Sequence, residues 1–171
     1  MMTALRVLGV QSHVVHGYVG NKMSQYSFQC LGCTFDAINT ITLANRPGVG
    51  TLTDKADFGY EILPDQLEVL LKALNHNDLV KDYDLVLSGF TNSSAVLDVL
   101  ADQIASWKEG DAPMYICDPV LGDNGRYYVK EPEELLKLYQ EKVLPLADLV
   151  TPNLFEALEL TGRGIGGGGG G

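Results

Sequence analysis

The chain has 171 residues, a formal net charge of −10 and 46% hydrophobic residues, values that suit one globular domain. Its acidity argues against nucleic acid or an anionic membrane as a partner, because both need a basic surface. No apolar run reaches the roughly 20 residues that span a bilayer. The odd number of cysteines and the lack of a signal-peptide pattern predict a cytoplasmic protein, in which Cys30 and Cys33 are buried structural thiols.

Segments typical of strands and of helices alternate along the chain. Short apolar runs predict strands at residues 5–10, 35–43, 83–89, 114–117 and 148–150. Capping residues and apolar periodicity predict helices at residues 21–31, 64–74, 93–107, 132–143 and 153–161. A polar loop with glycines occupies residues 44–63.

Several residues define the expected ends and faces of these helices. Asn21 and either Ser93 or Ser94 are suited to cap a helix, and Pro64 suits a first helical position. The apolar side of the second helix is expected to hold Leu67, Val69, Leu70, Leu71 and Leu74.

This alternation predicts an α/β fold of three layers, with a mainly parallel central sheet and helices on both faces. Ligands of such sheets bind beyond the carboxyl ends of the strands. The candidate site therefore lies in the loops that follow Val10, Leu43, Leu87, Cys117 and Val150.

Two carboxylates follow the strand at residues 114–117, in the segment 118–123 (DPVLGD). Gly122 allows a bend that brings Asp123 back towards Asp118. Two neighbouring carboxylates suit Mg²⁺, which takes one or two of them and completes its shell with water and phosphate oxygens. The same residues also suit an ordinary turn, so the segment alone leaves both interpretations open.

The segment 151–156 (TPNLFE) begins the last helix, directly after the last strand. Asn153 and Glu156 have the spacing of a capping box. A helix start at the end of a strand also attracts anions, and Glu156 in the first turn could hold water around a metal. The two interpretations are compatible.

A third polar segment, residues 11–22, joins the first strand to the first helix with a hydroxyl, glycines and an aromatic residue. Its spacing is not that of a Walker A loop. A pocket for a small heterocycle and a plain connecting loop are both consistent with these residue types.

Five segments together resemble the pyridoxal kinases, a family of the ribokinase-like superfamily. They are residues 10–15 (VQSHVV), 17–21 (GYVGN), 35–40 (FDAINT), 115–123 (YICDPVLGD) and 146–153 (LADLVTPN). The resemblance is collinear from about Leu5 to Gly162, which makes residues 1–162 an N-terminal ribokinase-like portion. Residues 163–171 are expected to be a disordered glycine-rich tail that represents a truncation scar, a linker or unassigned residues.

The resemblance implies a role for individual side chains. Ser12 and Val19 would contact the pyridine ring of pyridoxal, one of the vitamin B6 forms (vitamers) that the family binds. Pro47 and Phe90 stand on this vitamer side at positions where the family commonly has threonine and tyrosine. Asp118 and Asn153 would lie against the ATP phosphates, and Tyr128 in a flap over the nucleotide. The cation and its water shell would be organised by Asp123, Thr151 and Glu156.

The family transfers the γ-phosphoryl group of ATP to the 5′-hydroxymethyl group of pyridoxal, pyridoxine or pyridoxamine. The resemblance therefore implies ATP, Mg²⁺ or another divalent cation, a monovalent cation as a further candidate, and a homodimer. The family's catalytic base and adenine pocket lie in a C-terminal half that is missing here, so no residue is assigned as the base.

This chain alone is accordingly expected to be inactive. One alternative is a non-catalytic truncated product that binds pyridoxal or dimerises with a full-length kinase. Another is a related enzyme such as a hydroxymethylpyrimidine kinase, against which the segments 11–13 (QSH) and 17–21 (GYVGN) argue.

Overall fold

The computed structural model describes residues 4–46, 59–110 and 112–163. Its main sheet has six strands in the order β3-β2-β1-β4-β5-β8. These strands are β1 (Arg6–His16), β2 (Thr34–Asn45), β3 (Gly59–Glu61), β4 (Leu85–Ser88), β5 (Met114–Cys117) and β8 (Leu149–Val150). All neighbouring pairs are parallel except β2 and β3, so the predicted mainly parallel sheet is confirmed.

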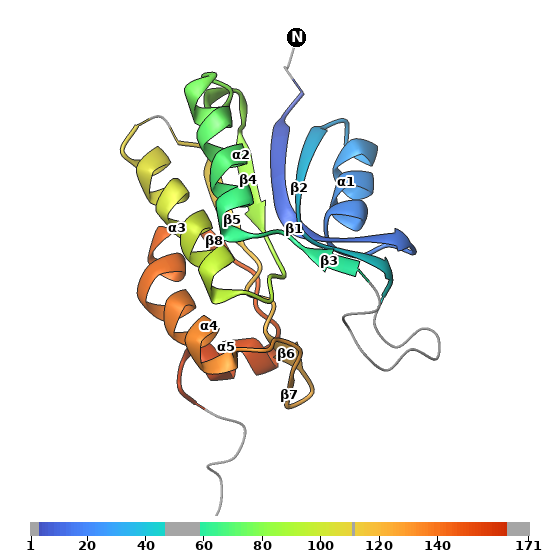
Figure 1. Ribbon diagram of the computed structural model, residues 1–171, viewed down its shortest axis with the longest axis vertical. Helices are drawn as coiled ribbons and strands as arrows, with labels where there is room; N and C mark the ends of the chain where they lie inside the picture. Colours follow the sequence, from blue (N-terminus) through green and yellow to red (C-terminus); the bar gives the residue numbers. More distant parts are fainter. Residues whose placement is uncertain (1–3, 47–58, 111, 164–171) are drawn as a thin grey trace, which may run out of the picture.

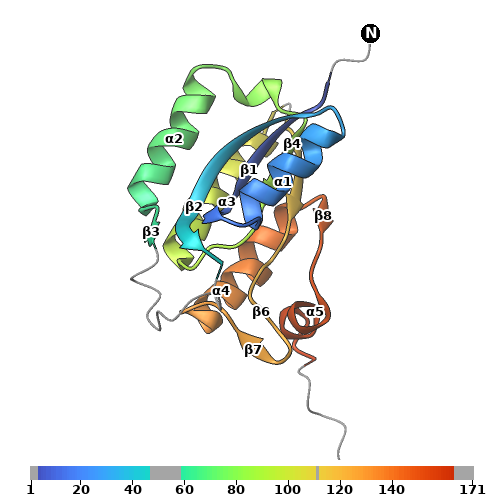
Figure 2. The same cartoon turned by 90° about the vertical axis from the view of Figure 1, so that its right-hand side faces the viewer.

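Helices cover both faces of this sheet, as Figures 1 and 2 show. The helices are α1 (Gly20–Cys30), α2 (Pro64–His76), α3 (Ser94–Lys108), α4 (Pro132–Leu138) and α5 (Leu154–Leu160). Helix α1 packs on β1 and β2, whereas α2, α3 and α4 form the layer on the opposite face. A two-stranded hairpin, β6 (Gly122–Asp123) and β7 (Arg126–Tyr127), lies beside α5. Among the described residues, no helix combines the length and apolar character needed to cross a bilayer.

The core between the sheet and the α2–α3–α4 layer is built from aliphatic and aromatic side chains. Leu67 and Leu71 of α2 are fully buried, one helical turn apart. Val69 and Leu70 are 66% and 46% exposed, so their predicted place on the buried side is wrong. They project from other sides of the helix, because successive residues turn by about 100°.

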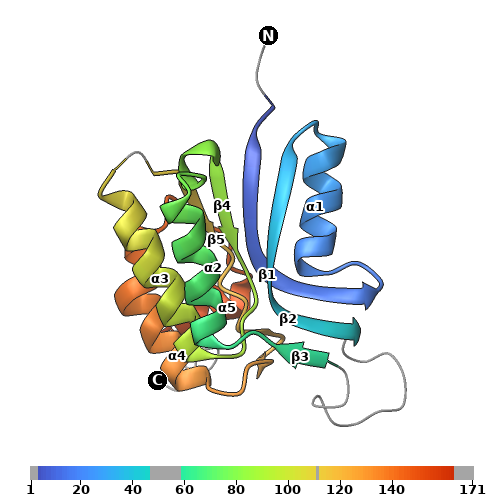
Figure 3. The same cartoon turned by 45° about the horizontal axis from the view of Figure 1, so that its top comes forward.

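The first strand is longer than predicted. β1 continues to His16 because β2 pairs with it far beyond the end of β4, and the register shifts between Gln11 and His13. Figure 3 shows both long strands extending past β4 towards β3. Ser12 consequently lies in a strand and not in a loop.

Asn21 does not cap α1, contrary to the prediction; Val19 occupies that position without a side-chain cap. The buried Asn21 amide instead donates to the carbonyls of Gln11 at 3.1 Å and Ile38 at 2.8 Å. It thereby joins β1 to β2 at the point where their register shifts.

Other predicted helix signals are confirmed or refined. The Ser93 hydroxyl accepts a hydrogen bond from Val96 N at 3.3 Å, and Pro64 begins α2. The predicted helix at residues 132–143 is α-helical only to Leu138, after which Tyr139–Val143 forms a π-helical turn.

Cys30 is exposed, so its predicted burial is wrong.

Candidate functional site

The polar segments after β5 and β8 meet at the same edge of the sheet. Cys117 and Val150 are register partners in these parallel strands, and Thr151 N donates to Cys117 O at 3.0 Å. Asp118 and Thr151 therefore emerge side by side, although 33 residues separate them in sequence. The side chain of Thr151 lies close enough to the Asp118 carboxylate to lower the pKa of that group.

Glu156 joins the two segments through its buried carboxylate. One oxygen accepts from Leu121 N at 3.0 Å and from Gly122 N at 3.5 Å. The other accepts from Asn153 N at 2.9 Å. With only 2% of the residue exposed, both oxygens are committed to backbone N–H groups, which fixes the loop after β5 against the start of α5.

Asn153 completes the predicted capping box and adds a further link. Its Oδ1 accepts from Glu156 N at 2.9 Å, while its Nδ2 donates to Gly122 O at 2.7 Å. The start of α5 is thereby fixed beside the hairpin strand β6, directly after β8.

Asp118 is the site carboxylate whose ionisation is most disturbed. Burial raises the pKa of Asp118 to about 6, and the negative charge of Glu156 acts in the same direction, while the Thr151 side chain opposes it. The neighbouring carboxylates of Asp118 and Glu156 create a negative potential that suits a divalent cation. Within the described ranges, however, no group of three His, Cys, Asp or Glu side chains has the arrangement of a metal site. A cation here would need water and phosphate oxygens to complete its shell.

Asp123 lies on the rim of this site and is exposed. Its two carboxylate oxygens accept from Asn124 N at 2.8 Å and from Asn124 Nδ2 at 3.0 Å. The bend that returns the chain is made by Asn124 and Gly125, both with positive φ, and not by Gly122. The Asn-Gly dipeptide is a strong hairpin signal and is the local pattern that predicts this turn.

The half-exposed Tyr128 follows this hairpin, and its N–H donates to Leu121 O at 2.8 Å. This bond holds the chain after β7 against the segment that carries Asp118 and Asp123. Tyr128 is therefore positioned beside that segment.

The other predicted site residues lie within β1, before α1 and after β4. Ser12 is buried in β1, and a Cβ at Gly20 would lie 2.1 Å from Ser12 O, so only glycine fits there. Val19 is the N-cap of α1 and directly precedes Gly20. Phe90 follows β4, and its carbonyl accepts from the Thr40 hydroxyl at 2.5 Å. Pro47 lies outside the described residues.

The order β1-β4-β5-β8 places these two groups of residues along one edge of the sheet. All four strands are parallel, so their carboxyl ends face the same side. Ser12 and Phe90 mark one end of this edge, and Asp118 and Thr151 mark the other. One end of this edge therefore presents a hydroxyl and an aromatic side chain, and the other a carboxylate and a hydroxyl.

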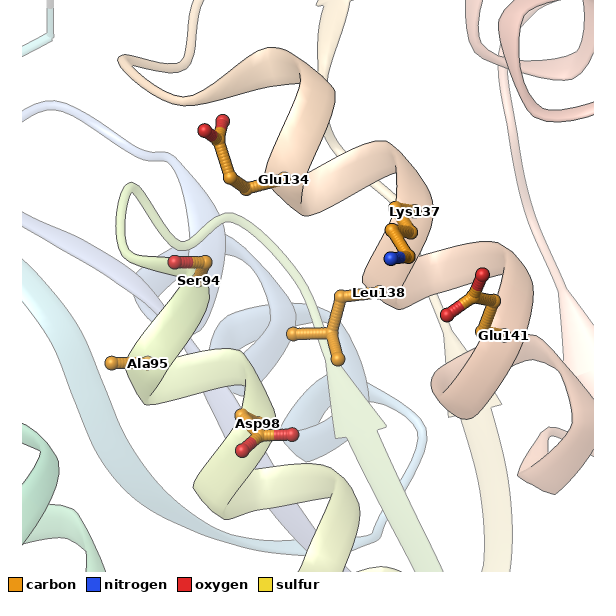
Figure 4. A pocket seen from close by; sticks show the side chains of 7 residues that line it. All are labelled: Ser94, Ala95, Asp98, Glu134, Lys137, Leu138 and Glu141. Carbon is orange, nitrogen blue, oxygen red and sulfur yellow. The ribbon is translucent and has the colours of Figure 1, made fainter.

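A cavity of about 340 Å³ lies elsewhere, between α3 and α4 (Figure 4). Its lining residues are Ser94, Ala95, Asp98, Glu134, Lys137, Leu138 and Glu141. None of them is a predicted site residue. Three carboxylates and one lysine give this cavity a negative charge that repels a phosphate group. The cavity is therefore not part of the candidate site.

The three-layer fold and the polar groups along one sheet edge place the chain in the ribokinase-like class of α/β proteins. A family model described as phosphomethylpyrimidine kinase matches residues 24–167, and the chain belongs to this family.

Pyridoxal kinases are its curated relatives. The human pyridoxal kinase is 42% identical over 165 residues, which are 94% of this chain and 50% of the relative. The pyridoxal kinase of Arabidopsis thaliana is 43% identical over 161 residues, again 94% of this chain and 50% of the relative. The chain spans about half the length of the curated relatives it matches, and the resemblance inferred from its motifs is confirmed.

Solved pyridoxal kinase structures share its fold. The enzyme of Leishmania donovani in complex with ADP and pyridoxamine has a TM-score of 0.79 and 36% identity, covering 92% of this chain and 52% of that chain. The enzyme of Entamoeba histolytica has a TM-score of 0.82 and 28% identity, covering 94% and 55%.

Proposed function

We propose that this chain carries part of the active site of an ATP-dependent pyridoxal kinase, which phosphorylates the 5′-hydroxymethyl group of pyridoxal, pyridoxine or pyridoxamine. The observation that carries the proposal is the Glu156 link between the segment 118–123 and the start of α5. It presents Asp118, Thr151 and the helix N-terminus together at the sheet edge where a phosphate chain would lie.

The vitamer would bind beside Ser12 of β1 and the residues that follow β4. Ser12 and Val19 would contact its pyridine ring, and Phe90 would line the opposite side, with Pro47 as a further proposed contact. The packing of Gly20 on Ser12 and the Asn21 bridge hold this part of β1 in place. A pre-positioned ring brings its hydroxymethyl group towards the phosphate side with little loss of entropy at the moment of reaction.

The nucleotide phosphates would lie against Asp118 and Asn153, beneath Tyr128. Asp123, Thr151 and Glu156 would organise Mg²⁺ and its water, with Glu156 acting through the backbone that it orders. When bound, the cation neutralises charge on the phosphate oxygens. The chain's own residues would orient the phosphates and exclude water; a monovalent cation is a further proposed cofactor.

No described residue is assigned as the base that accepts the hydroxyl proton. We therefore expect this exact chain to show no significant kinase activity. The test is an absorbance assay for ATP-dependent pyridoxal 5′-phosphate formation, run beside calorimetric titration with pyridoxal. Pyridoxal binding without turnover supports the proposal, turnover contradicts the assignment of an incomplete site, and absence of pyridoxal binding contradicts the vitamer site.

A second proposal is that the chain binds pyridoxal or pairs with a full-length kinase subunit without catalysing the reaction. The proposed assembly is a homodimer in the cytoplasm, with residues 1–162 as its ribokinase-like portion; residues 164–171 of the expected tail lie outside the described residues. Native mass spectrometry of this chain mixed with a full-length pyridoxal kinase tests the pairing. Observation of only the separate species would contradict it.

The description of the matching family favours one further candidate, phosphorylation of a hydroxymethylpyrimidine. Both ligands are small hydroxymethylated nitrogen heterocycles, so competition separates them. Displacement of pyridoxal by 4-amino-5-hydroxymethyl-2-methylpyrimidine at equal or lower concentration would favour the pyrimidine. Displacement only by the other vitamers would favour the pyridoxal kinase assignment.

A further inference from the structure

Three residues from distant parts of the chain meet next to the candidate site. Glu61 ends β3, Asn92 follows β4, and Lys130 follows β7. Asn92 Nδ2 donates to Glu61 Oε1 at 3.0 Å, and Asn92 Oδ1 accepts from Lys130 N at 3.0 Å. Lys130 Nζ donates to the same Glu61 oxygen, also at 3.0 Å. We call this group the Glu61–Asn92–Lys130 latch.

The latch needs an amide at its centre. Asn92 is 6% exposed and must donate to a carboxylate on one side while accepting from a backbone N–H on the other. An amide does both at once, whereas an aspartate would face the Glu61 charge with no proton to donate. These two bonds also fix which end of the amide is nitrogen and which is oxygen.

The ion pair contributes less than the amide. The side chains of Lys130 and Glu61 are 60% and 32% exposed, so water screens their attraction. The Asn92 bonds are partly buried, and losing them would leave Lys130 N without its acceptor. Asn92 is therefore the member whose loss should matter most.

Two members of the latch, Asn92 and Lys130, lie close in sequence to residues of the proposed site. Asn92 is two residues after Phe90, and Lys130 is two residues after Tyr128. The segments are also tied nearby: the Ser94 hydroxyl donates to Glu131 Oε2 at 2.8 Å, and the Thr40 hydroxyl donates to the Phe90 carbonyl. The latch thus connects the vitamer side of the sheet edge with the chain that carries the flap residue.

We propose that Asn92 is a positioning residue, which holds the segment 126–131 of the flap at a fixed place relative to Phe90 and β3 through the Glu61–Asn92–Lys130 latch. The functional role of Asn92 rests on the proposed function, because a kinase must align two substrates that are bound by different loops. The geometry of the latch itself does not depend on that function.

The test is amide hydrogen exchange of this chain, with Asn92→Ala and Glu61→Gln compared with the wild type. Asn77→Ala and Glu68→Gln are matched controls, because Asn77 is exposed at the end of α2 and Glu68 is paired with Lys72 on that helix. We expect exchange in residues 126–131 to accelerate about tenfold in Asn92→Ala and less in Glu61→Gln, with the slowest core amides unchanged in both. The controls should match the wild type.

Two results would overturn the latch: unchanged exchange in residues 126–131 in both variants, or an equal acceleration of all amides, which would indicate general destabilisation. Glu61→Gln keeps an oxygen acceptor and so remains informative if Asn92→Ala does not fold. Adding pyridoxal to the same samples provides a separate readout. Absence of pyridoxal binding by the wild type contradicts the proposed function, while the ligand-free exchange still decides whether the latch exists.

Discussion

The Glu156 carboxylate accepts a hydrogen bond from Leu121 N, 35 residues away in sequence, at 3.0 Å. The same side chain accepts from Gly122 N and Asn153 N. One buried acidic residue thus determines how the loop after β5 lies against the start of α5. In this structure Glu156 contributes to the site through the backbone it orders.

Replacing Glu156 by alanine should destabilise the fold strongly. The substitution leaves three backbone N–H groups without an acceptor in a buried place, and we expect the free energy of unfolding to fall by about 3 kcal/mol. Urea denaturation measures this change. Glu68→Ala, at a partly exposed position on α2, should shift the value by no more than about 0.5 kcal/mol. Equal losses in the two variants would show that the Glu156 bonds contribute nothing specific.

Asp118→Asn should stabilise the chain at neutral pH when no cation is bound. The folded-state pKa of about 6 lies above the ordinary value, so the native state retains a proton that the unfolded chain has already released. Stability from this group is complete at acidic pH and is lost as the pH rises through about 6. Asparagine removes that loss, and we expect a gain of about 1 kcal/mol at pH 7.5, since the group is only partly shielded from water.

Urea denaturation at pH 5 and pH 7.5 checks this expectation, with the exposed Asp82→Asn as the control. The variant should gain stability mainly at the higher pH. Added MgCl₂ should raise the stability of the wild type more than that of Asp118→Asn, because the Asp118 charge adds to the negative potential beside the proposed cation residues. A wild type that gains nothing from MgCl₂ would contradict a cation site beside Asp118.

Gly20→Ala should disturb the vitamer side far more than Gly17→Ala. Both glycines have positive φ, but a Cβ at Gly20 would lie 2.1 Å from Ser12 O, whereas nothing lies within 4 Å of one at Gly17. We expect losses of about 3 kcal/mol for Gly20→Ala and about 1 kcal/mol for Gly17→Ala. Thermal unfolding gives the stabilities, and calorimetry should show weaker pyridoxal binding for Gly20→Ala only. Similar losses in both variants would mean that backbone strain alone matters here.

The cysteines should differ sharply in reactivity. Cys30 is exposed, whereas Cys117 is fully buried, and burial raises the pKa of its thiol to about 11. At pH 8 Cys117 is therefore protonated and inaccessible, so iodoacetamide should modify Cys30 and spare Cys117 until the chain is unfolded. Peptide mass spectrometry of native and urea-treated samples measures this. Rapid native labelling of Cys117 would indicate that the sheet opens readily beside Asp118.

Local patterns anticipated much of the candidate site. Asn153 and Glu156 form their predicted capping box because it depends only on residues three positions apart in one helix. Asp118 and Thr151 come together as expected because each follows a strand of a parallel sheet, and parallel strands end at one edge. The apolar character of Val69 and Leu70 predicts that they lie on the buried side of α2. The helical repeat instead places both on exposed sides of the helix.

By itself, the sequence determined the alternation of strands and helices, the class of fold and the segments that carry the site, because these follow from hydrophobic periodicity and short-range chemistry. Only the tertiary structure decided that Glu156 binds the loop after β5, that Asn21 bridges β1 and β2, and that Asn92 joins Glu61 to Lys130. Each of these contacts links segments that the strand order β3-β2-β1-β4-β5-β8 brings together, and no local pattern encodes which distant backbone group a buried polar side chain will meet.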